Sequence, residues 1–428
     1  MLHSFNTSAQ TPSDTASLLT LDQCINYALE NDFNVRQARL DEEIGEREIR
    51  ANLSGWLPQI SAQYNYAHNF KLPTSAFGEN LIQIGRKNTS NILFEANQAI
   101  YSNELLLASR AAYHRRIQLD QNTQVTRINT VVEVSKSFYD ILLTNEQLRI
   151  LDENIARQEK QYRDAFSRYE FGLVDKTDYQ RASITLANSR SDKKRTQELL
   201  KAKYAYLKQL MGYPLESDIR LSFNLAQMEG QTSADTMQEL NYSNRVEFLQ
   251  VQTQRQLLQL NTTYYRLGFI PTVSAFINYN FVYLNNDLSQ LYRQSYPTSQ
   301  GGLSAALPIF QGTRRLQNIR IARLQEDRSE IDLENTRYMI HTEFQNALAN
   351  YKSNYNEWIT LRQNVTVARE VYEIIKLQYD EGVKAYIDLI VAETDLKATE
   401  INYYNALYRL LESKLDLERA HGNIKVNP

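Results

Sequence analysis

The sequence predicts an α+β membrane protein that combines long coiled-coil helical hairpins with transmembrane β-hairpins. Three observations lead to this fold class. The chain of 428 residues has only 13 glycines and 8 prolines, and they are unevenly spread. Apolar residues recur at coiled-coil spacing over long stretches, whereas two short stretches alternate between apolar and polar residues. Both patterns occur twice, in the same order, which predicts two internal repeats.

The composition permits a buried core and excludes several classes of protein. Hydrophobic residues make up 42% of the chain and charged residues 23%, which is not the composition of a disordered protein. A formal net charge of −3 argues against a protein that binds nucleic acid by neutralising phosphates. No run of about 20 apolar residues occurs, so we expect no membrane-spanning helix.

The sequence also lacks the patterns of an enzyme or a metal protein. The single cysteine, Cys24, excludes an intrachain disulfide framework, and the five histidines are not paired at metal-ligand spacing. Phosphate-binding glycine loops and hydrolase motifs do not occur. We therefore expect no catalytic residues, no cofactor and no metal.

The chain is expected to begin with a flexible segment followed by a helix. Residues 1–17 are rich in serine and threonine, and Phe5 to Gln10 is consistent with the remnant of a signal cleavage site whose apolar part is missing. Residues 18–53 and 233–267 are expected to form the opening helices of the two repeats. Asp22 fits the cap region of the first of them.

Each opening helix is followed by a stretch in which apolar and polar residues alternate, as in a β-strand with two different faces. The apolar positions are Ile60, Ala62, Tyr64, Tyr66 and Phe70 in the first stretch and Val273, Ala275, Ile277, Tyr279, Phe281 and Tyr283 in the second. Alternation over about 12 residues matches the length that a tilted strand needs to cross a bilayer, and the tyrosines suit an interfacial belt.

A return strand is expected after each of these strands. Residues 90–101 place Ile92, Phe94, Ala96 and Ile100 on one face, and residues 301–310 place Leu303, Ala305, Leu307 and Ile309 on one face. The connecting segments, 71–88 and 285–299, contain proline or glycine and are expected to be exposed loops. The β-hairpins would thus cover residues 58–101 and 271–310. The alternative is a pair of amphipathic hairpins that lie on the helices of a soluble protein.

Two long helical hairpins follow, each with a single glycine at its turn. Gly172 is the only glycine between Arg86 and Met211, and Gly382 is the only one between Gly312 and Gly422. The second hairpin shows a period of about 3.5 residues, typical of coiled coils, at Phe344, Leu348, Tyr351, Tyr355, Trp358, Leu361, Val365, Ala368, Tyr372, Ile375 and Tyr379. A helix over residues 313–378 would be roughly 100 Å long, too long for a globular core.

The two hairpins align with each other without a gap. An offset of 210 residues places Gly382 on Gly172, and Asp388 on Asp178. This register predicts a duplication. The expected segments are 1–17 (flexible), 18–212 (first repeat), 213–232 (irregular linker), 233–423 (second repeat) and 424–428 (C-terminal tail).

Four strands cannot close a barrel in a membrane, because the open edges would leave backbone groups unpaired in lipid. Several chains must therefore combine their strands. Two chains would supply eight strands, but their eight helical segments would pack as a filled bundle. Three chains supply a 12-stranded β-barrel continuous with a 12-helix α-barrel around an open bore, so we expect a homotrimer.

Four segments resemble the TolC family of outer-membrane efflux and secretion proteins. They are residues 19–31 (LTLDQCINYALEN), 56–60 (WLPQI), 306–312 (ALPIFQG) and 379–389 (YDEGVKAYIDL). The resemblance covers residues 18–423. It implies a passive exit duct of a tripartite efflux or type I secretion system in the outer membrane of Gram-negative bacteria. The duct would extend into the periplasm, where an adaptor (membrane fusion) protein and an inner-membrane pump would open it.

The resemblance also implies a gate at the periplasmic tip of the helical hairpins. It pairs Tyr379 with Asp178 and Lys384 with Thr177, and it makes Asp388 the residue of a narrow carboxylate ring. Two departures from the family pattern predict either a weaker gate or a lower preference for cations. Lys384 stands where the family has arginine, so a forked contact is lost. Val391 stands where the family has an acidic residue that would form a second ring.

Bland interpretations of these residues remain open. Asp178 and Asp388 could simply cap the return helices. Family members are sometimes lipidated at an N-terminal cysteine, but Cys24 lies within an apolar helical pattern and is expected to be a buried core thiol. The alternative function for the whole chain is a periplasmic coiled-coil scaffold or interaction protein without a pore. A receptor or adhesin anchored by its barrel is a third interpretation.

Overall fold

The computed structural model of the protein describes residues 18–78, 80–222 and 225–426. The expected flexible segment 1–17 lies outside the described residues, as does the end of the expected tail. The chain divides into two compact units. The helical unit contains residues up to Leu40, Gln121–Leu249 and the chain from Asn335 onward, and the sheet unit contains Asp41–Asp120 and Gln250–Glu334.

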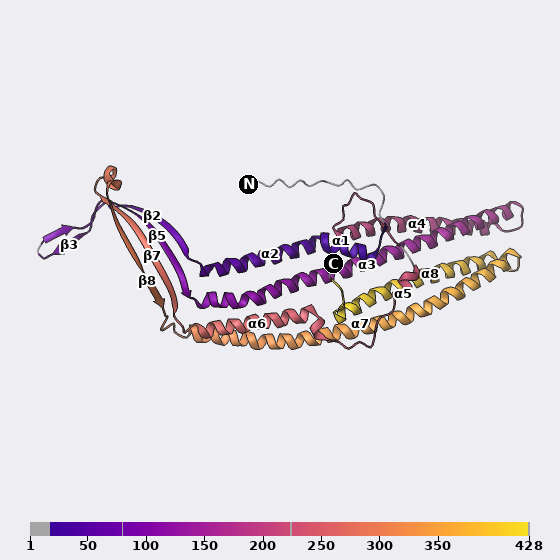
Figure 1. The fold of residues 1–428 in the computed structure, drawn as a ribbon. Coiled ribbons are helices and arrows are strands. Elements are labelled where there is room, and N and C mark those ends of the chain that lie inside the picture. The colour runs from indigo at the N-terminus through magenta and orange to yellow at the C-terminus, as the bar shows by residue number, and fades with distance from the viewer. Residues whose placement is uncertain (1–17, 79, 223–224, 427–428) are drawn as a thin grey trace. The chain divides into compact units, whose positions relative to one another are not determined.

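The long elements follow the same order in each half of the chain (Figure 1). They are α1 (Leu21–Asn31), α2 (Phe33–Leu53), β2 (Gln59–His68), β5 (Asn88–Tyr101), α3 (Asn103–Glu170) and α4 (Lys176–Met211) in the first half, and α6 (Val246–Leu267), β7 (Thr272–Asn285), β8 (Ser295–Ala306), α7 (Arg314–Asp380) and α8 (Tyr386–His421) in the second. None of the described helices is long and apolar enough to cross a membrane.

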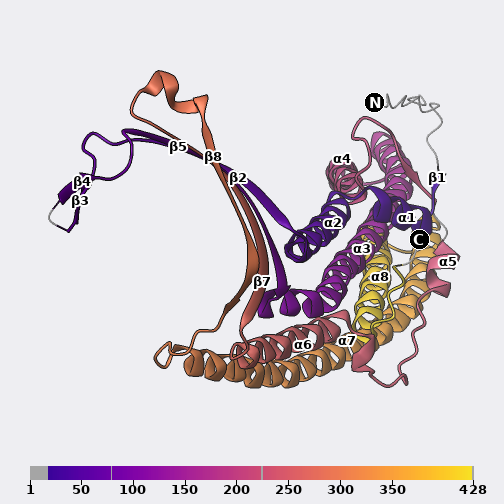
Figure 2. The same ribbon diagram turned by 60° about the vertical axis from the view of Figure 1, so that its left-hand side comes forward.

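The sheet unit is built around four antiparallel strands in the order β2-β5-β7-β8, which run side by side (Figure 2). The register places Tyr64 opposite Ile92, which in turn lies opposite Phe281. Because side chains alternate along a strand, this register puts the apolar positions of all four strands on one face. The predicted alternation in the first and third strands is therefore confirmed.

The return strands differ from their prediction in two places. A bulge between Ala99 and Tyr101 breaks the pairing of β5, so Ile100 does not continue the face of Ile92. The last strand covers Ser295–Ala306 and not 301–310. It ends two residues before Pro308, since proline lacks the N–H that a ladder needs, and it tolerates Pro297 because β8 is an edge strand.

The two loops of the sheet contain short elements that were not predicted. Residues 71–88 include a small hairpin, β3 (Thr74–Phe77) and β4 (Asn80–Gln83), and residues 285–299 include a 3-10 helix, η3 (Leu288–Arg293). In the same unit, α2 and α3 pack against each other through Ile49, Ala112 and Leu119.

In the helical unit the predicted first opening helix is two helices. Thr20 and Gln23 form a capping box at the start of α1, but the helix ends at Asn31, and the next residue, Asp32, has a non-helical backbone (φ −54°, ψ 133°). The Asp32 carboxylate accepts hydrogen bonds from the Asn34 amide (3.1 Å) and the Thr130 hydroxyl (2.7 Å). These bonds to α2 and α3 stabilise the break.

The second opening helix begins at Val246, not at Ser233. The preceding segment is fixed by Tyr351, whose hydroxyl accepts from the Ala234 amide and donates to the Thr232 carbonyl, both at 2.9 Å. With its backbone groups satisfied in this way, the segment does not need a helix. The expected linker contains β6 (Arg220–Leu221), which pairs with β1 (Leu18–Leu19), and α5 (Leu225–Gly230).

The predicted coiled-coil stripe forms the core of the helical unit. Phe344, Tyr351, Trp358 and Tyr372 are buried as expected, whereas Tyr355 is exposed. In this unit α4 runs back beside α3, and α8 beside α7 (Figure 1). Cys24 is fully buried in the same core, which confirms the prediction of a core thiol. Burial raises the pKa of this thiol to about 12, so it stays protonated.

Candidate functional site

The candidate site lies where the two helical hairpins turn. Gly172 and Gly382 adopt positive φ angles of 70° and 77°. The Gly172 amide donates to the Tyr169 carbonyl and the Leu173 amide to the Arg168 carbonyl, at 2.9 and 2.8 Å. The second turn repeats both bonds from Gly382 and Val383. These bonds satisfy the last carbonyls of α3 and α7, so each helix ends at a well-defined residue.

The aspartates of the predicted gate do not cap the return helices. The N-cap of α4 is Asp175, whose carboxylate accepts the Thr177 amide at 2.8 Å. The backbone N–H of Thr177, together with its side chain, lowers the pKa of Asp175. The N-cap of α8 is Ala385, which makes no side-chain cap bond. Asp178 and Asp388 lie in the first turn of their helices, after these N-cap residues, so the capping interpretation is wrong for both.

Asp178 and Tyr379 lie in one cluster. The Arg168 guanidinium is 5.2 Å from the centre of the Tyr379 ring, which is 5.6 Å from the centre of the Tyr386 ring. Burial raises the pKa of Tyr379, Arg168 opposes this effect, and the Asp178 carboxylate adds to it. Burial also raises the pKa of Tyr386, and the charge of Asp178 adds to this increase. Among the described residues Asp178 and Tyr379 form no hydrogen bond, so the two groups are neighbours without direct pairing.

The second predicted pair, Thr177 and Lys384, forms no hydrogen bond among the described residues. Thr177 and Lys384 are both exposed, and within the described part of the chain the Lys384 side chain makes no hydrogen bond or ion pair. Its backbone amide donates to the Gln378 carbonyl at 3.2 Å. Asp388, half-buried in the first turn of α8, likewise has no side-chain partner among the described residues.

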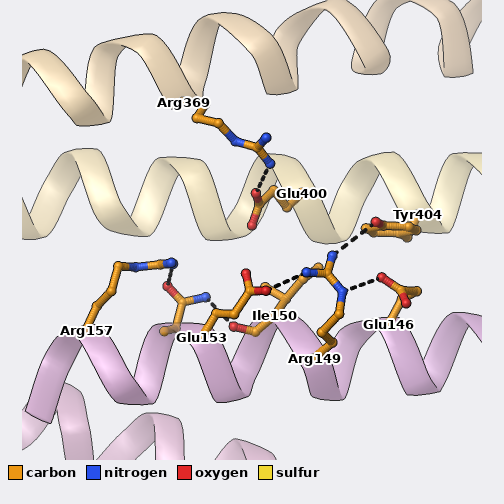
Figure 3. A network of polar contacts seen from close by, with 9 residues as sticks. Glu146, Arg149, Ile150, Glu153, Arg157, Arg369, Glu400 and Tyr404 are labelled. Carbon is orange, nitrogen blue, oxygen red and sulfur yellow. Dashed lines mark hydrogen bonds and ion pairs between the residues drawn. The ribbon is translucent and has the colours of Figure 1, made fainter.

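Beyond the turns lie polar contacts both within and between the hairpins. On α3, Arg149 contacts Glu146, Glu153 and the hydroxyl of Tyr404 on α8, and Arg369 on α7 pairs with Glu400 on α8 at 2.8 Å (Figure 3). Closer to the turns, Glu393 on α8 is buried against Arg157 on α3, with 3.7 Å between the charged atoms.

Glu393 and Glu400 were not predicted from the sequence, although a signal for them exists. Buried positions of α8 recur every three or four residues at Tyr386, Leu389, Glu393, Leu396, Glu400, Tyr403, Leu407 and Leu410. Two glutamates thus occupy the apolar stripe of a coiled coil. A carboxylate in such a stripe predicts a buried polar contact with a neighbouring helix.

The described residues contain no cluster of three or more histidines, cysteines, aspartates or glutamates that could hold a metal ion. The contacts described above belong to helix packing. Around the turns the arrangement is a seam between two hairpins, with tyrosine rings, guanidinium groups and carboxylates packed across it.

Comparison with known proteins identifies the relatives of the chain. The family model "Outer membrane efflux protein" matches residues 24–213 and again residues 238–423. The protease secretion protein PrtF of Dickeya chrysanthemi is 21% identical over 96% of this chain and 89% of its own length. The outer membrane protein TolC of Vibrio cholerae is 20% identical over 94% of this chain and 91% of its own.

Solved structures show the same fold. The CusC channel structure matches with a TM-score of 0.77 at 18% identity, over 96% of this chain and 95% of that chain. The Campylobacter jejuni outer membrane channel CmeC matches with a TM-score of 0.76 at 18% identity, over 94% of this chain and 85% of that chain. Cation efflux protein CusC of Escherichia coli is also similar in sequence, 21% identical over 93% of this chain and 85% of its own length.

Proposed function

Because the chain belongs to the outer membrane efflux protein family, we propose that it forms the exit duct of a tripartite efflux or type I secretion system. It is an outer-membrane channel protein that extends into the periplasm. Its relatives are channel proteins and not enzymes. The duct is a passive conduit, and a pore-less scaffold is not favoured by these relatives.

The proposal of a closed barrel made by three chains rests on the sheet. Its outer strands, β2 and β8, each have one edge without a partner strand among the described residues. Large apolar residues of one face, including Ile60, Ile277 and Leu303, are exposed. In lipid such a face is stable, but the open edges would cost several kcal/mol per unpaired group. Pooling four strands from each of three chains removes the edges and yields a 12-stranded barrel.

The helices support the same homotrimer. Leu324, Ile331 and Tyr338 are exposed on α7 at intervals of seven residues. Apolar side chains at this spacing form a seam that a neighbouring helix covers in a coiled coil. In the trimer, α3, α4, α7 and α8 of three chains would form the α-barrel. The order of elements supports two repeats, 18–212 and 233–423, around the linker 213–232.

The turns are the proposed gate and the contact site of partner proteins. Asp178 and Tyr379 would restrain the two hairpins, Lys384 and Thr177 would pair on closure, and Asp388 would line the narrow end of the bore. A periplasmic adaptor and an inner-membrane pump would release these contacts. The names of relatives, which include protease secretion and cation efflux proteins, support coupling to such a pump.

Membrane fractionation and planar-bilayer recording test the proposed function. The natively expressed protein is expected in the outer-membrane fraction, as a trimer by native mass spectrometry in detergent, and it should conduct ions. Recovery of a monomer from the soluble fraction would contradict the duct and support the scaffold. An insoluble trimer that does not conduct would support the anchored receptor.

A pair of variants tests the gate separately. Asp178→Ala combined with Lys384→Ala should raise the single-channel conductance, because both proposed contacts between hairpins are lost. The matched control is Lys194→Ala combined with Glu198→Ala, which removes an exposed ion pair of 2.9 Å from α4 and leaves the same net charge. Equal conductance in the two double variants would remove Asp178 and Lys384 from the gate.

A further inference from the structure

Glu393 lies on the seam between the two helical hairpins of one chain. Glu393 is only 3% exposed to solvent. It belongs to α8, and the apolar cluster next to it combines Tyr372, Tyr386 and Leu396 of the second hairpin with Ala182 of the first. Relative movement of the hairpins at this level would expose the Glu393 carboxyl group to water.

Arg157 is the cation that faces Glu393, but it does not form a hydrogen bond with the Glu393 carboxylate. Arg157 Nε is 3.7 Å from Glu393 Oε1, which is too long for a hydrogen bond. Both atoms are buried and have no hydrogen-bond partner among the described residues. The guanidinium instead donates to Asn154 Oδ1 at 2.6 Å and lies 5.6 Å from the centre of the Tyr372 ring. A buried carboxylate at this distance recovers little of its lost hydration.

Glu400, two turns further along α8, shows the contrasting case. It is also buried in the stripe, but Arg369 donates to its Oε1 at 2.8 Å (Figure 3). Arg369 belongs to α7, so this ion pair lies within the second hairpin. Glu400 therefore connects nothing across the seam, whereas Glu393 faces α3 of the first hairpin.

The groups around Glu393 can be named for every packed element. From α3 come Arg157, Gln158 and Gln161, from α7 comes the Tyr372 hydroxyl, and Tyr386 lies on the same helix. Among the described residues, α4 of the first hairpin contributes Ala182 to the apolar cluster, and its Asp192 pairs at 3.5 Å with Lys397, one turn from Glu393 on α8. Burial raises the pKa of Glu393, and interactions with Gln161, Arg157 and Gln158 oppose this without cancelling it.

We propose that Glu393 is a proton-linked lock, which holds the two hairpins together when its carboxyl group is neutral and releases them when it is ionised. The inference rests on the proposed duct with a gate at the hairpin turns. The sign follows from linkage. The packed seam binds the proton more tightly than a separated seam, in which the carboxylate is hydrated and titrates normally. Packing is therefore favoured as pH falls through the raised pKa, and separation is favoured as pH rises above it.

The distance between the two turns reports on the lock. Spin labels are attached to cysteines at Leu173 and Val383, which are exposed in the two turns. Cys24 is fully buried, and labelling of the unmodified chain provides the background. Labelled chains are diluted with unlabelled chains in the full trimer, so that distances within one chain are measured. The distances are recorded between about pH 4.5 and 8.5, a range above the ordinary pKa of glutamate.

In the unmodified sequence the distance should increase with pH. Glu393→Gln should keep the short distance throughout, since the amide imitates the neutral acid. Arg157→Gln should move the midpoint to higher pH by about one unit or more, because the cation that favours the ionised form is gone. Glu400→Gln is the matched control and should retain the original midpoint.

The proposal is overturned if the distance does not depend on pH, or if Glu393→Gln retains the original transition. Should Glu393→Gln not assemble, an unchanged midpoint in Arg157→Gln overturns it instead. Bilayer conductance is measured on the same samples. A trimer without conductance refutes the duct while the distances still decide the lock. A conducting trimer whose distances ignore the Glu393 substitution refutes the lock alone.

Discussion

Replacing Gly212 by alanine should destabilise the helical unit strongly. Gly212 ends α4 with a φ of 63°. A Cβ atom built there would lie 2.2 Å from the Asn31 carbonyl oxygen and 2.8 Å from the Asn31 carbonyl carbon. Both are backbone atoms, so no side-chain rotation can relieve the contact. The end of α4 and the end of α1 would have to separate.

The expected magnitude has two parts. An alanine in the left-handed conformation costs about 1–2 kcal/mol relative to glycine. Backbone shifts forced by overpacking cost about 1–3 kcal/mol more. Gly212→Ala should therefore lose about 2–5 kcal/mol. The matched control is Gly172→Ala, which has a similar φ of 70° but no atom within 4 Å of the added Cβ, so it should lose only the first part.

Denaturant titration of the purified protein, followed by helical circular dichroism, measures both variants under one set of conditions. Hydrogen exchange then locates the change, which should be concentrated in the last turn of α1 around Asn31. Equal losses in Gly212→Ala and Gly172→Ala would refute the steric argument. Gly422→Ala offers a replicate, since its Cβ would lie 2.4 Å from the Asn244 carbonyl oxygen.

Three further predictions concern other parts of the chain. Asp32→Ala should cost about 2–4 kcal/mol in the same titration, because it orphans a buried threonine hydroxyl and an amide at the start of α2; a loss below that of an exposed aspartate variant would contradict this. Hydrogen bonds from Arg116, and then Arg50, lower the pKa of Glu46 to about 2. Protection of the contact between α2 and α3 should therefore persist above the ordinary glutamate pKa and fall as pH drops toward 2, and Glu46→Gln should abolish this dependence in hydrogen exchange. Ile277→Lys should destabilise the trimer in the membrane by up to about 2–4 kcal/mol if the site is at mid-bilayer, and so reduce the amount of trimer recovered from membranes. Asn278→Lys on the opposite face should not reduce it. Equal recovery of the two variants would place Ile277 away from lipid.

Much of the fold could be predicted because its patterns are local. The alternation around Tyr64 states which residues share one face of the strand, and the stripe around Trp358 states which face of the helix is buried. The register agrees with the first, and burial agrees with the second. The turns at Gly172 and Gly382 were visible as lone glycines in stretches without other breakers. Such signals require only neighbours along the chain, so one sequence is sufficient to recognise them.

The errors lie where distant segments compete with local preference. A single opening helix was expected over residues 18–53, but Asp32 is held by Thr130, 98 positions away in the sequence. Ile100 follows the alternation of its strand, yet pairing with β7 introduces a bulge at that point. No pattern within either segment contains this information.

The candidate site shows the same division. The turn residues Asp178 and Tyr379 could be named from the sequence through family resemblance, and they lie in one cluster. The contact between Arg157 and Glu393 was missed, because the two residues lie 393 − 157 = 236 positions apart along the chain. Glu393 occupies the apolar stripe of α8, but Arg157 resembles an ordinary charged residue of a helix surface, so no local pattern pairs them. Their importance arises from burial at the seam, which requires both hairpins to be packed.

Periodic placement of apolar residues, by itself, specified the long helices and the two-faced strands. It could do so because burial of one face is a property of each element alone. Helix breaks, strand ends, the bulge and the buried carboxylate were settled by contacts between segments far apart in the chain. Such contacts depend on hydrogen-bond partners and on access of water, and both of these exist only after the segments have packed together.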